Sequence, residues 1–404
     1  MNYTREDLLP RISHLQQCLS VDKRPIGLFL GAGCPMSIQD ENRCPLIPDI
    51  AGISKLVREQ LQQCAEHRNL WGKVDGNLKK DGNCNPTVED FLSHVRALEA
   101  VVGNDKVRGL SAQQLQTLDS AVCNLIHRTV NKKLPSDQTP YHSVSLWAHA
   151  TQRKFPIEIF TTNYDLLLEQ ALEKSRVPYF DGFSGVLRPL FDPLLLEGDL
   201  PPWTRLWKLH GSINWYQNES REVFRGTVRE DGPRRVIHPS HLKYQESRRM
   251  PYLAMVDRFR SFLKSPTAVL ILCGYSFRDD HINETIIQGL QHTQTAVAFA
   301  LMFGQLGGYD NAVNLATNQP NLNVFARNGG IIGGRRVEWL ERDSESLPAD
   351  TGSAVTWEQT ASTDGQTKYK AEFKLGDFAV FGKFLQEIVG NVRSISVENY
   401  RDAL

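Results

Sequence analysis

Four short apolar runs along the chain each stop at a polar or glycine-rich turn. They lie in residues 26–33, 157–163, 205–212 and 268–276, and their turns read GAG, TTN, LHGS and GYS. A short, continuous apolar run is typical of a strand that is buried on both faces of a parallel sheet. Because ligands of open α/β sheets bind beyond the carboxyl ends of the strands, we predict an α/β protein whose four turns converge on one crevice.

Helical periodicity dominates the region between the first two runs. Thr87 with Asp90 and Ser111 with Gln114 have the spacing of capping boxes, and each pair precedes apolar residues on one helical face. We therefore predict a mostly helical insertion over residues 53–150. The core would consist of residues 1–52 and 151–330.

The last part of the chain has a different pattern. The segments VTWEQTAS and TKYKAEFKL alternate in polarity around Asp364-Gly365, which predicts a β-hairpin. Apolar residues then recur at helical spacing from Phe381 to Ile388. Residues 331–404 are therefore expected to form a small unit of a hairpin and a closing helix.

Charge and composition argue against proteins that bind nucleic acid or membranes through a large net charge. The chain has 404 residues, of which 41% are hydrophobic, and its 46 Lys and Arg balance 46 Asp and Glu. This balance argues against a general attraction to nucleic acid or to an anionic membrane. The basic stretch at residues 220–249 leaves local nucleic-acid contact open, although a solvated loop or a protein interface is the favoured interpretation.

Cysteine usage and the amino terminus indicate a cytoplasmic protein. The seven cysteines include no Cys-x-x-Cys pair, so the sequence signals neither a disulfide framework nor a structural zinc. The N-terminal residues have no apolar signal core. No stretch approaches the roughly 18 apolar residues of a membrane span.

The GAG turn suggests a bound phosphate. Gly31 and Gly33 would let the backbone approach an anion, and Pro35 suits the first turn of a helix whose N–H groups face that anion. A tight turn without any ligand is an equally good interpretation of the motif alone. Met36 stands where a dinucleotide-binding dehydrogenase would have its third glycine, which argues against that class.

Two polar residues at strand ends are candidates for chemistry. Asn163 precedes a predicted helix, so on position alone a helix N-cap is favoured over a ligand contact, and Asp165 would complement the helix dipole. His210 is followed by glycine at the end of a strand, where its tuneable pKa suits a general base. A purely structural histidine is an equal alternative.

The ordered set of these motifs resembles the sirtuin family of NAD-consuming proteins. The resemblance covers roughly residues 25 to 290 and implies a Rossmann-like parallel sheet with helices on both faces. The matching stretches are Gly31-Ala32-Gly33, Pro48-Asp49, Thr161-Thr162-Asn163-Tyr164-Asp165, His210-Gly211 and Gly274-Tyr275-Ser276.

The departures from the family pattern indicate a particular branch. Sirtuin deacylases have Pro-Asp-Phe-Arg after the GAG turn and a zinc module with two Cys-x-x-Cys pairs. Here Pro48-Asp49 is followed by Ile50-Ala51, and Cys273 is the one cysteine between His210 and Gly274. The variants TTNYD, KLHGSINW and GYSFRDDHIN look most like the zinc-free sirtuin-like proteins of bacterial antiviral defence. That branch implies hydrolysis of NAD to nicotinamide and ADP-ribose.

The resemblance also implies a role for each motif residue. Nicotinamide leaves NAD as a neutral molecule, so the protein must mainly orient the ribose and supply an activated water. Asn163 would hold the ribose hydroxyls or that water, and His210 would take the proton. The implied NAD contacts are Gly31, Ala32 and Gly33 at the pyrophosphate, Gly274 and Ser276 at the adenosine ribose, and Thr162 and Asp165 in the loop, where Asp165 mainly braces the backbone.

Other functions remain as alternatives. One is an NAD-dependent protein deacylase, which the missing zinc module makes less favoured, and another is a non-catalytic sensor of NAD or ADP-ribose. A homo-oligomer with contacts through the helices of residues 53–150 is expected, because an inserted apolar-faced unit has surface left to bury. The resemblance further implies a possible partner ATPase of the HerA type.

Overall fold

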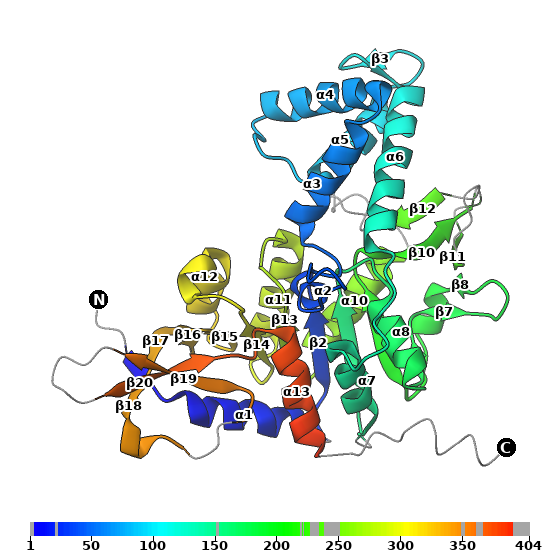
Figure 1. Cartoon of the computed structure of the whole chain (residues 1–404). Helices are drawn as coiled ribbons and strands as arrows, with labels where there is room; N and C mark the ends of the chain where they lie inside the picture. Colours follow the sequence, from blue (N-terminus) through cyan, green and yellow to red (C-terminus); the bar gives the residue numbers. More distant parts are fainter. Residues whose placement is uncertain are drawn as a thin grey trace.

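A ten-stranded sheet forms the centre of the molecule (Figure 1). The computed structural model describes residues 4–20, 23–150, 153–218, 220, 222–226, 234–237, 251–348, 352–360 and 367–390. The strands of this sheet are β1 (Thr4–Glu6), β2 (Ile26–Leu30), β5 (Glu158–Thr161), β6 (Tyr179–Phe180), β9 (Thr204–Lys208), β13 (Val269–Cys273), β14 (Val297–Leu301), β15 (Leu322–Ala326), β16 (Gly329–Ile332) and β17 (Arg335–Trp339). Their order is β1-β17-β16-β15-β14-β13-β2-β5-β9-β6.

The four predicted strands are neighbours at the centre of this sheet. Strands β13, β2, β5 and β9 lie side by side, and each adjacent pair is parallel. All five residues of β2 are buried, as expected for a strand covered on both faces. The two antiparallel pairs of the sheet are β15–β16 and β16–β17. The α/β fold with a mostly parallel sheet is therefore confirmed.

Helices cover both faces of the sheet because alternate strand residues point to opposite sides. One face packs against α1 (Leu8–Ser20), α7 (Pro140–Ala150), α8 (Leu167–Lys174) and α13 (Phe378–Val389). The other face packs against α10 (Tyr252–Leu263), α11 (Asp280–His292) and α12 (Asp310–Asn318). In strand β2, Leu28 belongs to the first core cluster and Phe29 to the second.

Four helices form an arm that projects from the sheet (Figure 1). They are α3 (Ile50–Leu61), α4 (Ala65–Lys80), α5 (Val88–Val101) and α6 (Ala112–Val130), with a short ribbon of β3 (Lys106–Val107) and β4 (Leu110–Ser111) before α6. Both predicted capping boxes are present, at Thr87 with Asp90 and at Ser111 with Gln114. The boundaries between the predicted domains stay predictions.

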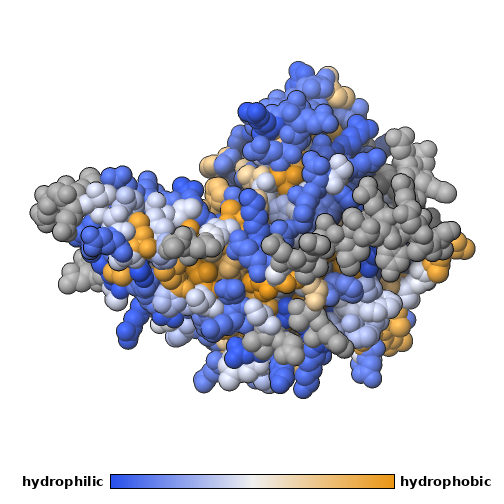
Figure 2. Space-filling model, turned by 60° about the horizontal axis from the view of Figure 1, so that its bottom comes forward, coloured by the Kyte–Doolittle hydropathy of each residue, from blue (hydrophilic) through white to orange (hydrophobic). Residues whose placement is uncertain are grey.

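The arm buries most of its apolar surface within itself. In the described part of α3–α6, the large apolar side chains that remain exposed are Leu56, at 38%, and Val101, at 70%. The visible face of the projecting helices is mostly hydrophilic (Figure 2). The physical reason given for a homo-oligomer through this arm is therefore weaker than the sequence suggested, and the oligomer remains a proposal.

A second, smaller sheet begins where β9 ends. Its strands are β7 (Phe183–Ser184), β8 (Leu190–Phe191), β10 (Gly211–Gln217), β11 (Val223–Arg225) and β12 (Arg234–Ile237). The chain leaves the main sheet after Lys208 and enters β10 at Gly211, whose φ of +86° suits glycine. The predicted LHGS turn is thus the junction between two sheets. Most of the basic stretch at residues 220–249 lies outside the described residues.

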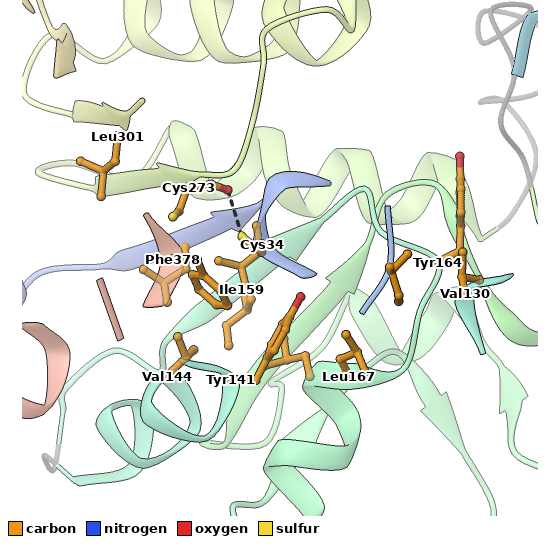
Figure 3. Packing of buried hydrophobic residues seen from close by; sticks show 14 of the residues in the cluster. Cys34, Val130, Tyr141, Val144, Ile159, Tyr164, Leu167, Cys273, Leu301 and Phe378 are labelled. Atoms are coloured by element: carbon orange, nitrogen blue, oxygen red, sulfur yellow. Dashed lines mark hydrogen bonds between the residues drawn. The ribbon is translucent and has the colours of Figure 1, made fainter. Parts of the chain in front are cut away.

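The C-terminal prediction is confirmed for its strands and helix. Strand β19 (Val355–Thr360) pairs antiparallel with β20 (Lys368–Phe373), and α13 follows. The turn at Asp364-Gly365 lies outside the described residues. A third strand, β18 (Glu341–Asp343), pairs with β20 and was not predicted. Helix α13 packs against α7, where the ring centroids of Phe378 and Tyr141 are 5.0 Å apart (Figure 3).

No helix in the described part of the chain is both long enough and apolar enough to cross a membrane.

Candidate functional site

The four predicted turns start level with one another at one edge of the sheet. Leu30 is the register partner of both Cys273 and Thr161, and Thr161 is the partner of Lys208. These are the last residues of β2, β13, β5 and β9. The residues that follow them therefore lie at the carboxyl edge, where open α/β sheets bind ligands.

The GAG and GYS turns interlock through their glycines. The amide of Gly31 donates to the carbonyl of Cys273 at 2.9 Å, and the amide of Gly33 donates to the carbonyl of Gly274 at 2.9 Å. A Cβ on Gly31 would lie 2.4 Å from the Gly274 carbonyl oxygen, and one on Gly274 would lie 2.6 Å from the Cys34 amide nitrogen. Close packing between backbones is thus sufficient reason for glycine at these positions.

The helix expected after the GAG turn is a single turn. Helix α2 spans Gly33–Met36, and the Cys34 amide donates to the Gly31 carbonyl at 3.0 Å. Pro35 lies in the first turn of this short helix, as expected. The amides of Gly33 and Cys34 donate to backbone carbonyls, and the phosphate contact predicted for this turn stays a prediction. The Cys34 thiol also donates to the Cys273 carbonyl at 3.3 Å (Figure 3). Ala32, between the two glycines, is exposed.

Asn163 does not cap a helix. Helix α8 begins at Leu167, so the N-cap interpretation of Asn163 was wrong. Its side-chain amide instead donates to the Gly31 carbonyl at 3.1 Å, and its backbone amide donates to Thr161 Oγ1 at 3.0 Å. Asn163 and Thr162 are both half-buried. The side chain of Asn163 thus ties the TTN turn to the GAG turn at the edge of the crevice.

The side chain of His210 contacts a carboxylate, that of Asp279, for which the sequence predicted no role. Its Nε2 lies 3.0 Å from Asp279 Oδ2, and both side chains are largely buried. Asp279 Oδ1 in turn accepts from the amides of His281 and Ile282, at 3.1 and 3.3 Å, and so caps α11. The available signal was the acidic pair Asp279-Asp280 shortly after the GYS turn, because an aspartate is a typical N-cap residue. Nothing in the sequence indicated that the carboxylate would reach His210.

Asp165 braces the loop beneath the crevice. Its carboxylate accepts from the Leu167 amide at 3.0 Å, and its carbonyl accepts from Lys208 Nζ. Lys208 also pairs with Glu169 at 2.9 Å. Burial raises the pKa of Asp165 to about 6, against the opposing charge of Lys208. At 6% exposure, Asp165 supports the backbone, and the direct NAD contact predicted for it stays a prediction.

The loop before α8 is also attached to the helical arm. The hydroxyl of Tyr164 donates to Glu89 Oε1 at 2.6 Å, and Glu89 lies in the first turn of α5. Burial raises the pKa of the Tyr164 hydroxyl well above its usual value. The Tyr164 ring lies 6.5 Å from the His210 ring, centroid to centroid. The arm therefore contacts the candidate site through Glu89.

Pro48-Asp49 has a structural role here. The side chain of Asp49 accepts from the Gly52 amide at 2.9 Å and caps α3. A capping aspartate needs no ligand to explain its position.

The described residues contain no group of three or more His, Cys, Asp or Glu side chains placed to hold a metal ion. All seven cysteines are free.

Comparisons with known proteins find a similarity over part of the chain. Residues 157–321, which hold the TTNYD, LHG and GYS motifs, match the family model of the SIR2-like domain. No curated protein matches. A solved structure from work on the mechanism and regulation of Sir2 enzymes is similar at 13% identity, with a TM-score of 0.33, covering 72% of this chain and 84% of that one. The segment from β5 to the end of α12 is therefore similar to the SIR2-like domain.

Proposed function

We propose that this protein hydrolyses NAD to nicotinamide and ADP-ribose. The observation that carries the proposal is the His210–Asp279 pair at the carboxyl edge of the sheet. Asp279 binds Nε2, so the carboxylate orients the ring and stabilises the protonated imidazole. Nδ1 is then the nitrogen that accepts a proton from the attacking water.

Asn163 supplies the second element of the proposed mechanism. Its side chain is anchored to the Gly31 carbonyl, so the amide group has a fixed place beside the turn that follows β2. A fixed amide beside the ribose orients the hydroxyls or the water without a reorganisation cost. Because nicotinamide leaves as a neutral molecule, the site needs no strong general acid.

The groups that could bind the pyrophosphate and the adenosine ribose of NAD differ from those that the sequence predicted. The amides of Gly31, Gly33 and Cys34 have backbone acceptors, so they are poorly suited to hold the pyrophosphate. Ala32 and Ser276 are exposed at the same edge, and Thr162, which follows β5, is half-buried. We assign the pyrophosphate and the adenosine ribose to this exposed rim.

The direct test is incubation of the purified protein with NAD and measurement of released nicotinamide. His210→Ala should lower kcat/KM by about a hundredfold to ten-thousandfold while retaining appreciable NAD binding. Asp279→Asn should lower it less, because the imidazole stays in place. His14→Ala is the matched control, since His14 is exposed on α1 against Phe299. Turnover by His210→Ala at the unmutated rate would remove this histidine from the mechanism.

The same experiment separates the alternatives. Release of nicotinamide that depends on an acylated peptide would favour a deacylase, and NAD binding without consumption would favour a sensor.

We further propose that NAD depletion serves antiviral defence, with a homo-oligomer and an ATPase of the HerA type as partners. This extension rests on the motif resemblance. Its test is the NAD content of cells that carry the gene, with and without phage, alongside cells that carry Asn163→Ala. Equal NAD loss in both cell lines would contradict it.

A further inference from the structure

The loop between β13 and α11 forms hydrogen bonds with side chains of two helices. The Tyr275 hydroxyl donates to Asn283 Oδ1 at 2.8 Å and also lies 3.1 Å from the Asp279 carbonyl oxygen. The Phe277 carbonyl accepts from the side chains of Asn283 and Asn311, at 2.9 and 3.0 Å. These hydrogen bonds fix the path of residues 274–279 at the carboxyl edge.

This segment contains a strained residue. Phe277 is fully buried and has a φ of +56°, which is a genuine outlier for a bulky side chain. Such a conformation persists only where the surroundings determine it, and it recurs at functional sites. The residues on either side, Ser276 and Arg278, are both exposed.

The exposed groups at this end of the edge are aromatic and cationic. Phe303 follows β14, the next strand after β13, and its side chain is 62% exposed. Arg327 follows β15, and its guanidinium lies 5.9 Å from the Phe303 ring centroid. Among the described residues, neither Arg278 nor Arg327 forms an ion pair, and Arg327 Nε is buried without a hydrogen-bond partner.

The nearby carboxylates are directed elsewhere. Asp279 is engaged by His210. Asp280 lines a pocket of about 360 Å³ between α11 and α12, together with Asn283, Glu284 and Asn311. Asp310 is exposed in the first turn of α12. The loop that follows β13 thus exposes an arginine, Arg278, that pairs with no carboxylate of the described residues.

The order of the strands indicates which half of a bound dinucleotide would lie over the ends of β13 and β14. His210 and Asn163 follow β9 and β5, and the GAG turn follows β2. Neighbouring strands are about 4.8 Å apart, so the ends of β13 and β14 lie roughly 5 and 10 Å beyond the GAG turn. With the nicotinamide ribose at Asn163, the adenosine half extends over these two strands. Dinucleotide sites that favour NAD bind the 2′-hydroxyl with a carboxylate, whereas an arginine accommodates a 2′-phosphate.

We infer that this crevice accepts NADP, with Arg278 bound to the 2′-phosphate and the Phe303 ring stacked on adenine. The inference rests on the proposed hydrolase function and extends its substrate class. Water attacks the anomeric carbon of the nicotinamide ribose, and the electron pair of the broken C–N bond leaves with nicotinamide. The water proton passes to His210, and the products are nicotinamide and 2′-phospho-ADP-ribose.

The first test compares the two substrates. We expect kcat/KM for NADP to equal or exceed that for NAD. Loss of a charge-assisted contact of about 1.5–3 kcal/mol corresponds to about a tenfold to hundredfold fall, so Arg278→Ala should lower the NADP:NAD ratio of kcat/KM by that factor. Arg278→Lys should restore part of the ratio. Arg335→Ala is the matched control, because Arg335 is an exposed arginine at the start of β17.

The second test does not depend on activity. Adenosine 2′,5′-bisphosphate should bind the unmutated protein at least about tenfold more tightly than 5′-AMP by calorimetry, and Arg278→Ala should abolish the difference. Phe303→Ala should weaken both ligands. Equal binding of the two ligands, or an unchanged ratio in Arg278→Ala, would overturn the inference. A preference for NAD that Asp280→Asn removes would also overturn it, and would identify Asp280 as the group that reads the 2′-hydroxyl.

The two levels of the proposal fail separately. Hydrolysis of NAD with no turnover of NADP contradicts the substrate class alone. Tight binding of the bisphosphate without any nicotinamide release contradicts the hydrolase alone.

Discussion

Asn163 illustrates how one residue at a strand end can have two interpretations that only its partner distinguishes. The position before a predicted helix favours a cap, but α8 begins too late for that role. The observed bond to the Gly31 carbonyl joins residues that are 132 positions apart in the chain. The residue therefore affects the geometry of the crevice and has little influence on the stability of α8.

We predict that Asn163→Ala abolishes most NAD hydrolysis and lowers the free energy of unfolding by about 1 kcal/mol, the usual worth of one hydrogen bond. The two effects are measured by nicotinamide release and by denaturant unfolding. The helicity of α8 should not change. Retained turnover in a destabilised variant would indicate that Asn163 has only a structural role.

A second prediction at this scale concerns pH. The pKa of Asp165 is about 6 in the folded protein, above the ordinary 3.8. Between about pH 4 and pH 6 the folded chain holds a proton that the unfolded chain has released, so the free energy of unfolding falls as pH rises through this window. Asp165→Asn removes that contribution. Relative to the unmutated protein, the variant should gain roughly 1–3 kcal/mol between pH 4.5 and pH 8.

Denaturant titrations at the two pH values check this, with Asp310→Asn as the exposed control. The same pH dependence in Asp165→Asn and in the unmutated protein would mean that this carboxyl does not titrate in the window.

At the scale of elements, two turns behave as one unit. The GAG turn after β2 donates two backbone hydrogen bonds, to the carbonyls of Cys273 and Gly274. The GAG turn and the GYS turn after β13 fit together because Gly31, Gly33 and Gly274 have no Cβ at the contact. The interlock aligns the adjoining ends of the two strands. It also explains why a glycine-rich turn can occur here without direct amide contacts to a phosphate.

We predict that Gly274→Ala destabilises the protein by several kcal/mol. The added Cβ would lie 2.6 Å from the Cys34 amide nitrogen, and the φ of +66° disfavours any side chain. Gly76→Ala is the matched control, because Gly76 lies inside α4 with no atom within 4 Å of a new Cβ. That change should stabilise the protein by up to about 1 kcal/mol. Thermal unfolding of both variants measures the contrast, and equal melting temperatures would refute the interlock.

At the scale of the whole molecule, the arm and the sheet form one connected structure. The Tyr164–Glu89 bond joins the loop that holds Asn163 to α5, so a change in the position of the arm can reach the candidate site. This contact gives the proposed assembly a physical route to the crevice, whichever surface the assembly uses.

We predict a homo-oligomer in sedimentation, with contacts through α3–α6. Val101→Asp should then weaken the assembly, because Val101 is the most exposed apolar side chain of the described arm. Leu187→Asp is the comparison, since Leu187 is 99% exposed in the turn between β7 and β8. Dissociation by Leu187→Asp alone would move the interface to that turn, and a strict monomer would exclude the oligomer.

We also predict that the purified protein carries no stoichiometric zinc and keeps its fold in a chelator. Metal analysis and circular dichroism test this expectation. One tightly bound zinc per chain, with loss of fold on its removal, would revive the deacylase alternative.

The sequence by itself determined the elements whose signals are local. Continuous apolar runs identified β2, β5, β9 and β13, and the spacing of Thr87 with Asp90 identified the start of α5. These predictions succeeded because burial on both faces and capping depend on residues that are close in the chain. The order of the turns also predicted that they share one edge.

Only the tertiary structure decided which groups meet at that edge. The pairing of His210 with Asp279, the bond from Asn163 to Gly31 and the interlock of Gly31 with Gly274 all join different strands. Each contact depends on the order and register of β9, β5, β2 and β13, which no local pattern encodes. The candidate residues could therefore be identified from the sequence. Which residues contact one another follows from the packing of the sheet.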